Sequence, residues 1–192
     1  IHSKNDRIVE KVQIDQNHYF SITAFTKGLG NHIREQSKEP KTWIELGKQI
    51  GLLHKLTKKF KPIHKRPKWQ DDTLYQIADR VLIGDNLPIL DILKQKIRDI
   101  VSMPTNKDNY GLIHTDLHFG NMVMDEANNL TFFDFDDCAY KHFISDIAIV
   151  IFYRLFYYDI SVQEKSEHTV WILNHFFKGY IENNYLPKEE LN

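Results

Sequence analysis

The sequence predicts an α+β fold in which a short β-hairpin precedes a mainly helical body. Residues 9–14 and 19–25 alternate apolar and polar side chains around the polar turn 15–18, which is typical of a hairpin. Apolar residues then recur at helical spacing in several segments between 43 and 103. Short apolar runs between polar loops follow from 111 to 133, so a small amount of further strand is expected there.

The first two helices are placed by their apolar spacing and by the residues that end them. The spacing predicts a helix over 43–60, and Pro62 and Pro67 mark the loop that follows it. A second helix is expected over 72–83, with Gly84 as its C-terminal stop.

Three more helices are expected in the second half of the chain. One starts near Pro88, at the favoured first-turn position, and ends before Pro104. Two aromatic-rich helices over 144–158 and 162–185 close the chain, and Ser161 is the expected N-cap of the second.

Length and composition favour one globular domain with no broad charged face. The 192 residues carry 25 basic and 26 acidic side chains, so a general electrostatic grip on nucleic acid or an anionic membrane is not expected. The longest apolar-looking stretch, 147–158, is shorter than the ~20 residues that span a membrane, and Arg154 interrupts it. The only cysteine, Cys138, excludes an intramolecular disulfide and predicts a reducing, cytoplasmic location.

Glycine is scarce, and its positions exclude the two common phosphate-binding loops. The chain has 8 glycines, about 4% against a usual ~7%. They form neither the G-x-G-x-x-G pattern nor the G-x-x-x-x-G-K-[ST] pattern. A nucleotide site of either kind is therefore not predicted within these residues.

A polar cluster between residues 113 and 137 requires a functional explanation. The segment reads Ile-His-Thr-Asp-Leu-His-Phe-Gly-Asn, then an expected hairpin over 122–133, then Asp-Phe-Asp-Asp. Because a hairpin brings its two ends together, Asn121 and Asp134 should lie side by side, with Asp116 on the incoming loop. Amide and carboxylate oxygens are ligands suited to Mg²⁺. The cluster therefore predicts a magnesium site at Asn121 and Asp134, with Asp116 free to act on a substrate proton.

The alternative is that these are ordinary turn residues, because Asp and Asn are favoured in loops for local hydrogen bonding. However, Asp116, Asp134 and Asp136 placed close together without a cation would carry a large desolvation and repulsion cost. A bound metal ion removes that difficulty, so the metal-site interpretation is preferred.

Several segments resemble the aminoglycoside phosphotransferase and choline kinase-like family, small-molecule relatives of protein kinases. Residues 114–121, His-Thr-Asp-Leu-His-Phe-Gly-Asn, resemble its catalytic loop, and residues 133–137 resemble its metal-binding segment. Residues 145–148 resemble its Asp-Ile/Leu-Ala signature. The family also has a helix that carries small residues and a Leu-His pair. A similar pattern is formed here by Gly47, Gly51, Leu53 and His54. The likeness covers roughly residues 20–158.

This resemblance implies a protein-kinase-like fold and a Mg²⁺-dependent transfer of the γ-phosphate of ATP or GTP to a hydroxyl of a small molecule. Asp116 would orient the acceptor hydroxyl and accept its proton. Asn121 and Asp134 would hold the Mg²⁺ that bridges the nucleotide phosphates.

Other polar residues of the cluster are expected to support these three. His114 would brace the loop, and His118 would either pack within it or contact phosphate or acceptor. Asp136 would reach the metal shell or the acceptor, while Asp137 and Asp146 would hold backbone amides.

The resemblance also divides the chain. Residues 1–30 would be the last strands of the N-terminal lobe and the hinge, and residues 31–192 the helical C-terminal catalytic lobe. Thr23, Ala24 and Phe25 would lie in the hinge, where a nucleotide base meets backbone groups. The alternative for this segment is an ordinary edge hairpin.

The family's phosphate loop, strand lysine and helix glutamate have no counterparts before the hinge, since only about 20 residues precede it. The chain could be a fragment of a longer kinase, a chain completed by another polypeptide, or a decayed enzyme. We interpret it as a fragment, because it lacks an initiator methionine, and a missing N-terminal lobe would then be its partner.

Two other functions fit part of this pattern. His114, Asp116 and His118 could bind a transition metal in a hydrolase, but that leaves Asn121 and Asp134 unexplained. A non-catalytic kinase-like binding module is the second alternative. The presence of Asp116, Asn121 and Asp134 together argues against it, whereas the short segment before the hinge argues for it. The identity of the hydroxyl acceptor stays open.

Overall fold

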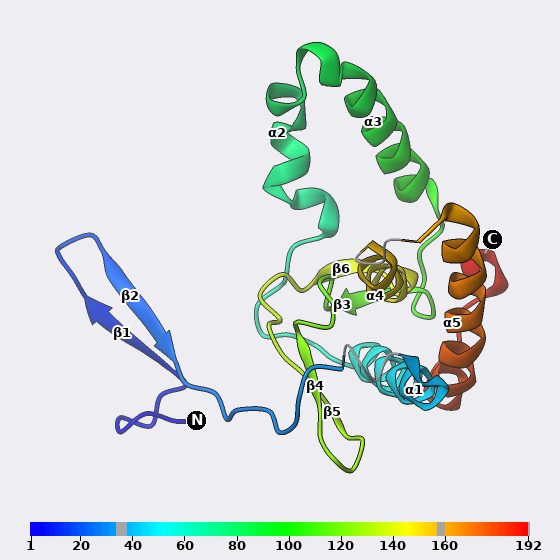
Figure 1. Ribbon diagram of the computed structural model, residues 1–192. Helices are drawn as coiled ribbons and strands as arrows, with labels where there is room; N and C mark the ends of the chain where they lie inside the picture. Colours follow the sequence, from blue (N-terminus) through cyan, green and yellow to red (C-terminus); the bar gives the residue numbers. More distant parts are fainter. Residues whose placement is uncertain (34–37, 157–159, 192) are drawn as a thin grey trace.

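The computed structural model describes residues 1–33, 38–156 and 160–191. Strands β1 (Val9–Gln13) and β2 (Tyr19–Thr23) form an antiparallel hairpin that projects from the rest of the molecule (Figure 1). The turn is closed by the Asp15 carboxylate, which accepts hydrogen bonds from the backbone N–H groups of Asn17 and His18. The predicted hairpin is confirmed.

Helices α1 (Pro40–Thr57) and α5 (Val162–Asn183) pack against each other along the body of the molecule (Figure 1). The contact is close enough to require glycine. A Cβ atom on Gly47 would lie 2.0 Å from the carbonyl oxygen of Phe176, and one on Gly179 would lie 1.8 Å from that of Ile44. The two helix backbones therefore touch.

Helix α1 begins and ends about three residues earlier than the apolar spacing predicts. Pro40 occupies its first turn, where the missing N–H group costs no hydrogen bond. After Thr57, the backbone N–H of Phe60 bonds to the Thr57 carbonyl in a turn. Phe60, the apolar residue with which the predicted helix ends, thus belongs to that turn.

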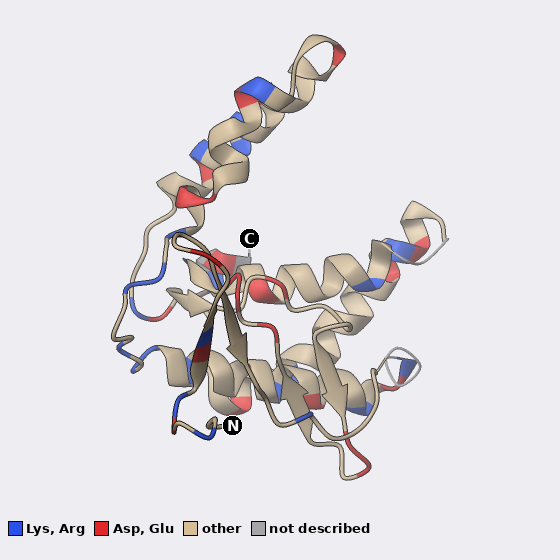
Figure 2. Ribbon diagram, turned by 90° about the vertical axis from the view of Figure 1, so that its left-hand side faces the viewer, with Lys and Arg blue, Asp and Glu red and all other residues tan. Residues whose placement is uncertain are grey.

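Helices α2 (Thr73–Val81) and α3 (Leu87–Ser102) form an arm that extends from the body and carries charges of both signs (Figures 1 and 2). Asp72 is the N-cap of α2, because its carboxylate accepts the backbone N–H of Leu74. Helix α2 ends before the predicted stop. Gly84, with φ of 59°, begins the short 3₁₀ turn η3 (Gly84–Asn86).

Two further antiparallel strand pairs carry the site. Strand β3 (Tyr110–Ile113) pairs with β6 (Ala139–His142), and β4 (Met122–Met124) pairs with β5 (Leu130–Phe132). The β4–β5 hairpin was predicted, and its turn is held by the Asp125 carboxylate. Strand β6 was not predicted.

Helix α4 (Ile144–Phe156) follows β6 directly, and the last two residues of the predicted helix lie outside the described residues. Ser161 caps α5 as predicted. Its hydroxyl accepts the N–H of Glu164, whose carboxylate accepts the Ser161 N–H in return. A short turn, η4 (Lys188–Leu191), ends the chain.

The hydrophobic core lies between α1, α4, α5 and the two strand pairs. Its fully buried side chains include Trp43, Leu46, Ile50, Leu117, Met122, Phe143, Ile147, Ile172 and Phe176. No helix among the described residues is long and apolar enough to cross a membrane. The fold places the loops after β3 and after β5 at one edge of this core.

Candidate active site

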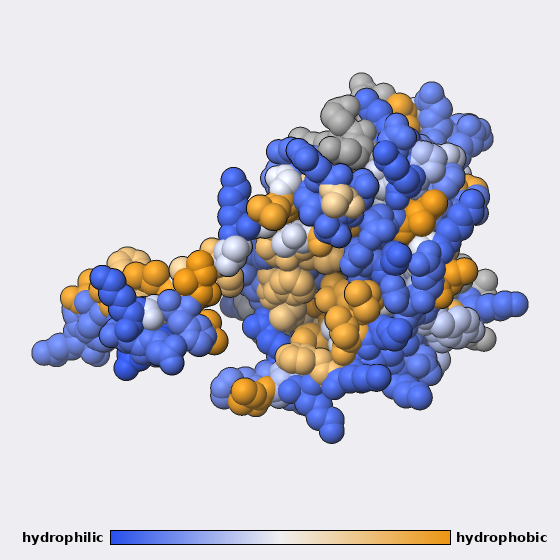
Figure 3. Space-filling view, turned by 90° about the horizontal axis from the view of Figure 1, so that it is seen from below, coloured by the Kyte–Doolittle hydropathy of each residue, from blue (hydrophilic) through white to orange (hydrophobic). Residues whose placement is uncertain are grey.

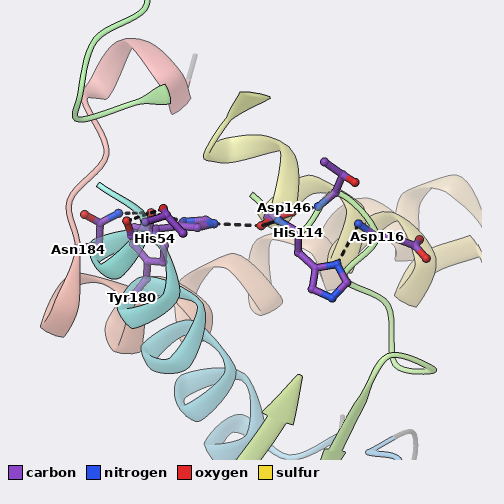
Figure 4. Close-up of polar contacts among 8 residues, drawn as sticks. His54, His114, Asp116, Asp146, Tyr180 and Asn184 are labelled. Atoms are coloured by element: carbon purple, nitrogen blue, oxygen red, sulfur yellow. Dashed lines mark hydrogen bonds and ion pairs between the residues drawn. The ribbon is translucent and has the colours of Figure 1, made fainter. Parts of the chain in front are cut away.

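The loop after β3 is fixed by a buried carboxylate on α4. Asp146 accepts the backbone N–H groups of His114 and Thr115, at 3.0 and 2.8 Å (Figure 4). Thr115 has φ of 71°, in the left-handed region that a β-branched residue rarely adopts. The two hydrogen bonds hold this strained residue in place, and Asp116 follows it directly. The Asp146 role agrees with the sequence-based expectation.

Asp116 and Asn121 are in direct contact. The side-chain amide nitrogen of Asn121 donates to the backbone carbonyl and to Oδ2 of Asp116, both at 3.0 Å. The Asp116 side chain is about one third exposed, whereas Asn121 is buried. Oδ1 of Asp116 and the amide oxygen of Asn121 make no hydrogen bond to any described residue, so both remain available to a ligand.

Asp134 lies beside these two residues, as the hairpin predicted. The backbone N–H of Phe133 donates to the carbonyl of Asn121 at 3.1 Å, which joins the two ends of β4–β5. Asp134 then turns sharply, with φ of 66°. Three of the predicted site residues are therefore brought together.

The Asp134 carboxyl is surrounded by negative charge. A hydrogen bond to the Asp136 side chain and the charge of that group raise the pKa of Asp134 above its usual value. Desolvation by neighbouring protein atoms and the charge of the nearby Asp116 raise this pKa further, while His114 opposes the shift. The ionised cluster is unfavourable by itself, and a cation between these oxygens would relieve it.

The two histidines of the loop are engaged in local hydrogen bonds. His114 contacts the carbonyl of Phe133 through Nε2 at 2.9 Å, and its Nδ1 faces the N–H of Asp116. Nδ1 of His118 accepts the N–H of Gly120, and its Nε2 lies 3.4 Å from Asp116. The ring of His114 thus lies between the loop after β3 and the end of β5.

This geometry does not support the hydrolase alternative. Both ring nitrogens of His114 face protein backbone, so His114, Asp116 and His118 do not converge on one point. Within the described ranges, no three His, Cys, Asp or Glu side chains are grouped as metal ligands, either in this triad or among Asp116, Asp134 and Asp136.

Arg66 holds the loop that follows Asp134, and sequence reasoning missed it. Its guanidinium donates to the carbonyl of Cys138 at 2.9 Å and also to the carbonyl of Asp136. Arg66 comes from the loop between α1 and α2, about 70 residues away in the sequence. No local pattern marks such a long-range backbone contact. The Asp137 carbonyl, in turn, accepts the hydroxyl of Thr115.

A cavity of about 970 Å³ opens beside this cluster. Residues 25–28 and 30–32 form one wall, and Val123 of β4 with residues 131–136 forms the other. Hydrophobic residues gather on this face of the body, next to the projecting hairpin (Figure 3). Of the three predicted hinge residues, Phe25 lines the cavity, whereas Thr23 and Ala24 precede its wall.

The wall over residues 28–32 is attached to the β4–β5 hairpin. Asn31 exchanges two backbone hydrogen bonds with Met124, at 3.0 and 2.9 Å. Gly30 has φ of 99°, and a Cβ atom there would lie 1.9 Å from the Met124 carbonyl. His32, another residue that sequence reasoning missed, contacts the carbonyls of Phe119 and Met122 through Nδ1. The cavity wall is thereby tied to the loop between β3 and β4.

Comparison with known proteins agrees with this geometry. Residues 7–165 match the phosphotransferase enzyme family. The chain is 32% identical over 187 residues to amicoumacin kinase from Bacillus subtilis (strain 168), covering 96% of this chain and 55% of that protein. The chain thus spans a little over half the length of this relative.

Solved structures of similar proteins share the fold. An amicoumacin kinase in complex with AMP-PNP, Ca²⁺ and Ami has a TM-score of 0.90 at 28% identity, over 100% of this chain and 57% of that one. A microcompartment-associated aminopropanol kinase has a TM-score of 0.69 at 21% identity, over 99% and 60% of the two chains. A spectinomycin phosphotransferase in complex with ADP and spectinomycin has a TM-score of 0.54 at 15% identity, over 100% and 60%.

The predicted protein-kinase-like α+β fold is confirmed by these likenesses, and so is the resemblance first seen in the loop of Asp116. With a matching segment that covers most of its length, the chain belongs to the phosphotransferase enzyme family.

Proposed function

We propose that this chain carries the acceptor and metal sites of a phosphotransferase that moves the γ-phosphate of ATP or GTP to a hydroxyl group of a small molecule. One observation carries the proposal. Asp116, Asn121 and Asp134 meet at one place, and Asp134 also lines a cavity of about 970 Å³. A base, two oxygen ligands and an adjoining cavity are among the parts that phosphoryl transfer needs.

Asp116 is the proposed base. Asn121 anchors one of its carboxylate oxygens, which fixes the direction of the other. That second oxygen has no partner among the described residues and can accept the proton of an acceptor hydroxyl. His118, with Nε2 at 3.4 Å from Oδ2, helps to hold the same carboxylate.

The residues present fit a magnesium ion. The amide nitrogen of Asn121 is used by Asp116, so its amide oxygen is left for a cation. Asp134 has a raised pKa because of Asp136 and Asp116, and a divalent cation would favour its ionised form. Asn121 and Asp134 would hold the ion, with Asp136 in support. When bound, the ion would neutralise charge on the nucleotide phosphates.

We further propose that the nucleotide occupies the cavity beside the hinge. Residues 25–32 offer backbone groups on one wall, and Thr23 and Ala24 lead into it. The AMP-PNP held by an amicoumacin kinase that is 28% identical favours ATP over GTP.

Residues 1–30 are proposed as the last strands of a nucleotide-binding lobe, and residues 31–192 as the catalytic lobe. The hairpin supports this division because it carries large apolar side chains that lie open to solvent, including Phe20 at 64% and Ile22 at 54% exposure. Further strands would cover such a surface. The phosphate-gripping residues would then come from protein outside these 192 residues.

The acceptor is proposed to be a small hydroxyl compound, and amicoumacin is the first to test. Two relatives, at 32% and 28% identity, are amicoumacin kinases.

The decisive experiment measures nucleotide consumption by the protein expressed from its complete reading frame. ADP or GDP release is followed with amicoumacin and a panel of amino alcohols, sugars and aminoglycosides. Asp116→Asn should lower kcat by about 10²–10⁴-fold without weakening the binding of Mg-AMP-PNP. Glu126→Gln, which removes an exposed carboxylate at the tip of the β4–β5 hairpin, is the matched control. Unchanged turnover in Asp116→Asn would refute the assignment of the base.

A titration with Mg-AMP-PNP tests the metal site separately. Asp134→Ala should bind the nucleotide more weakly than the parent in Mg²⁺, and the two should differ little in EDTA. Equal affinity in Mg²⁺ would contradict the role of Asp134. Nucleotide binding with no turnover of any acceptor would favour the binding-module alternative.

A further inference from the structure

A chain of hydrogen bonds runs from Lys58, directly after α1, through buried side chains to the loop after β3. Figure 4 shows its part from Asn184 to Asp146. Lys58 Nζ lies 2.6 Å from Oδ1 of Asn184, whose Nδ2 lies 2.7 Å from the Tyr180 hydroxyl. That hydroxyl lies 2.9 Å from Nδ1 of His54, and Nε2 of His54 lies 3.2 Å from Oδ2 of Asp146. The side chains of Tyr180, His54 and Asp146 are completely buried.

The chemistry of these groups fixes the direction of every bond in the chain. A lysine ammonium can only donate, so Asn184 turns its carbonyl oxygen toward Lys58 and its amino group toward Tyr180. The Tyr180 oxygen accepts from Asn184, and among the described residues the only acceptor for its own proton is Nδ1 of His54. An Nδ1–H on His54 would leave this buried hydroxyl proton without an acceptor. Burial raises the pKa of the Tyr180 hydroxyl far above its usual value, so the hydroxyl keeps this proton. Nδ1 of His54 is therefore an acceptor.

The proton of His54 then lies on Nε2, which faces Asp146. Asp146 accepts three donors in this arrangement: His54 Nε2–H and the backbone N–H groups of His114 and Thr115. A proton on Nδ1 instead would aim the lone pair of Nε2 at the carboxylate, and the two acceptors would repel each other. The carboxylate would shift, and the strained Thr115 would lose its partner.

We propose that Tyr180 is a positioning residue of the active site, because its hydroxyl selects the Nε2–H form of His54 that holds Asp146 and the catalytic loop in place. The proposal rests on the proposed function, since Asp116 follows Thr115 directly. Tyr180 lies on α5, far from Asp116 in the sequence, and acts only through His54 and Asp146.

The test compares Tyr180→Phe with Tyr110→Phe in the protein expressed from its complete reading frame. Tyr180→Phe removes the hydroxyl but keeps the ring that packs on Phe176. Tyr110→Phe also removes a hydrogen-bonded hydroxyl, one that donates to the Tyr140 carbonyl at 2.9 Å outside the chain of bonds. Two-bond ¹H–¹⁵N spectra identify the protonated ring nitrogen of His54, with His54→Gln as the assignment control. Exchange rates of the Thr115 amide and steady-state kinetics complete the set.

We expect the parent His54 to carry its proton on Nε2 alone. In Tyr180→Phe, this single form should be lost and the Thr115 amide should exchange about tenfold faster. The kcat should fall about tenfold, because a small displacement of a catalytic group is costly, while the nucleotide KM stays within about twofold. Tyr110→Phe should match the parent in all three measurements.

A double variant isolates the route through His54. A glutamine side chain at this position offers a fixed N–H donor and has no tautomers. Adding Tyr180→Phe to His54→Gln should therefore change kcat and Thr115 exchange by less than about twofold. A full tenfold loss in the double variant would show that Tyr180 acts by another route and would overturn the proposal.

Two further outcomes would overturn it without any acceptor being known. One is a parent His54 protonated on Nδ1, and the other is a Thr115 amide that exchanges at the parental rate in Tyr180→Phe. Neither measurement depends on turnover. A parent that consumes no nucleotide would therefore refute the proposed function, while the spectra and exchange rates still decide the role of Tyr180.

Discussion

Gly179→Ala tests how closely α1 and α5 are packed and what that packing does for the site. A Cβ atom on Gly179 would lie 1.8 Å from the carbonyl oxygen of Ile44 and 2.8 Å from the backbone nitrogen of Lys48, where ordinary contacts begin at 3.4 Å. Both neighbours are backbone atoms, so no rotation of a side chain can relieve the overlap. The helices must separate by an amount on the order of 1.5 Å.

The expected loss of stability follows from three contributions. Replacing Gly by Ala inside a helix gains about 1 kcal/mol from helix propensity. Overpacking costs up to about 3 kcal/mol, since a gap of this size forfeits much of the dispersion energy between facing side chains such as Ile50 and Phe176. Separation also breaks the bond between Tyr180 and His54, worth about 1 kcal/mol. The net destabilisation should be about 3 kcal/mol.

Urea unfolding and hydrogen exchange measure this effect in the protein expressed from its complete reading frame. Exchange across residues 40–57 is the deciding measurement, because a protein of more than one unit need not unfold in a single step. Lys178→Ala, at the exposed neighbouring position, should change stability by less than about 0.5 kcal/mol. If Gly179→Ala behaves like Lys178→Ala in both measurements, the packing of α1 on α5 through glycine is refuted.

Two more predictions concern the supports of the site and of α5. Ser161→Ala should destabilise the protein by about 1 kcal/mol at pH 7 in urea unfolding, through loss of the N-cap. Hydrogen bonds to Ser161 lower the pKa of Glu164, so these bonds stabilise the folded protein fully above the usual glutamate pKa of 4.5. The stabilisation fades as the pH falls through the lowered pKa of Glu164. The difference from the parent should therefore shrink at acid pH, and a constant difference would contradict the reasoning. Arg66→Ala should release the carbonyls of Asp136 and Cys138. Calorimetry should then show Mg-AMP-PNP binding weakened about threefold to tenfold. Parental affinity would show that the guanidinium does not hold the loop that follows Asp134.

The part of the site that sequence could predict lies within one short segment. Asp116, Asn121 and Asp134 are within about 20 residues of each other, and the β4–β5 hairpin alone is enough to bring the last two together. Turn chemistry and strand alternation are local properties, so their consequences can be worked out without the rest of the fold. The same holds for the β1–β2 hairpin and for Ser161 as a helix cap.

The supports of the site could not be predicted, because each depends on a distant segment. Arg66 acts on backbone carbonyls, which leave no mark in the sequence. His32 does the same for the catalytic loop. Strand β6 has only four residues, and its pairing with β3 joins segments about 30 residues apart. A short strand of this kind is set by its partner rather than by its own side-chain pattern.

The glycines link the local motifs of the site to the long-range packing that supports them. Their scarcity argued against a phosphate-binding loop, and their positions show a different use. Gly47 and Gly179 let α1 and α5 touch, which brings Tyr180 within hydrogen-bonding distance of His54 and so reaches Asp146 and the catalytic loop. A side chain at either glycine would separate the helices that carry the two partners of this bond. The geometry around Asp116 therefore depends on helix packing as well as on its own loop, and a search for catalytic residues alone would overlook it.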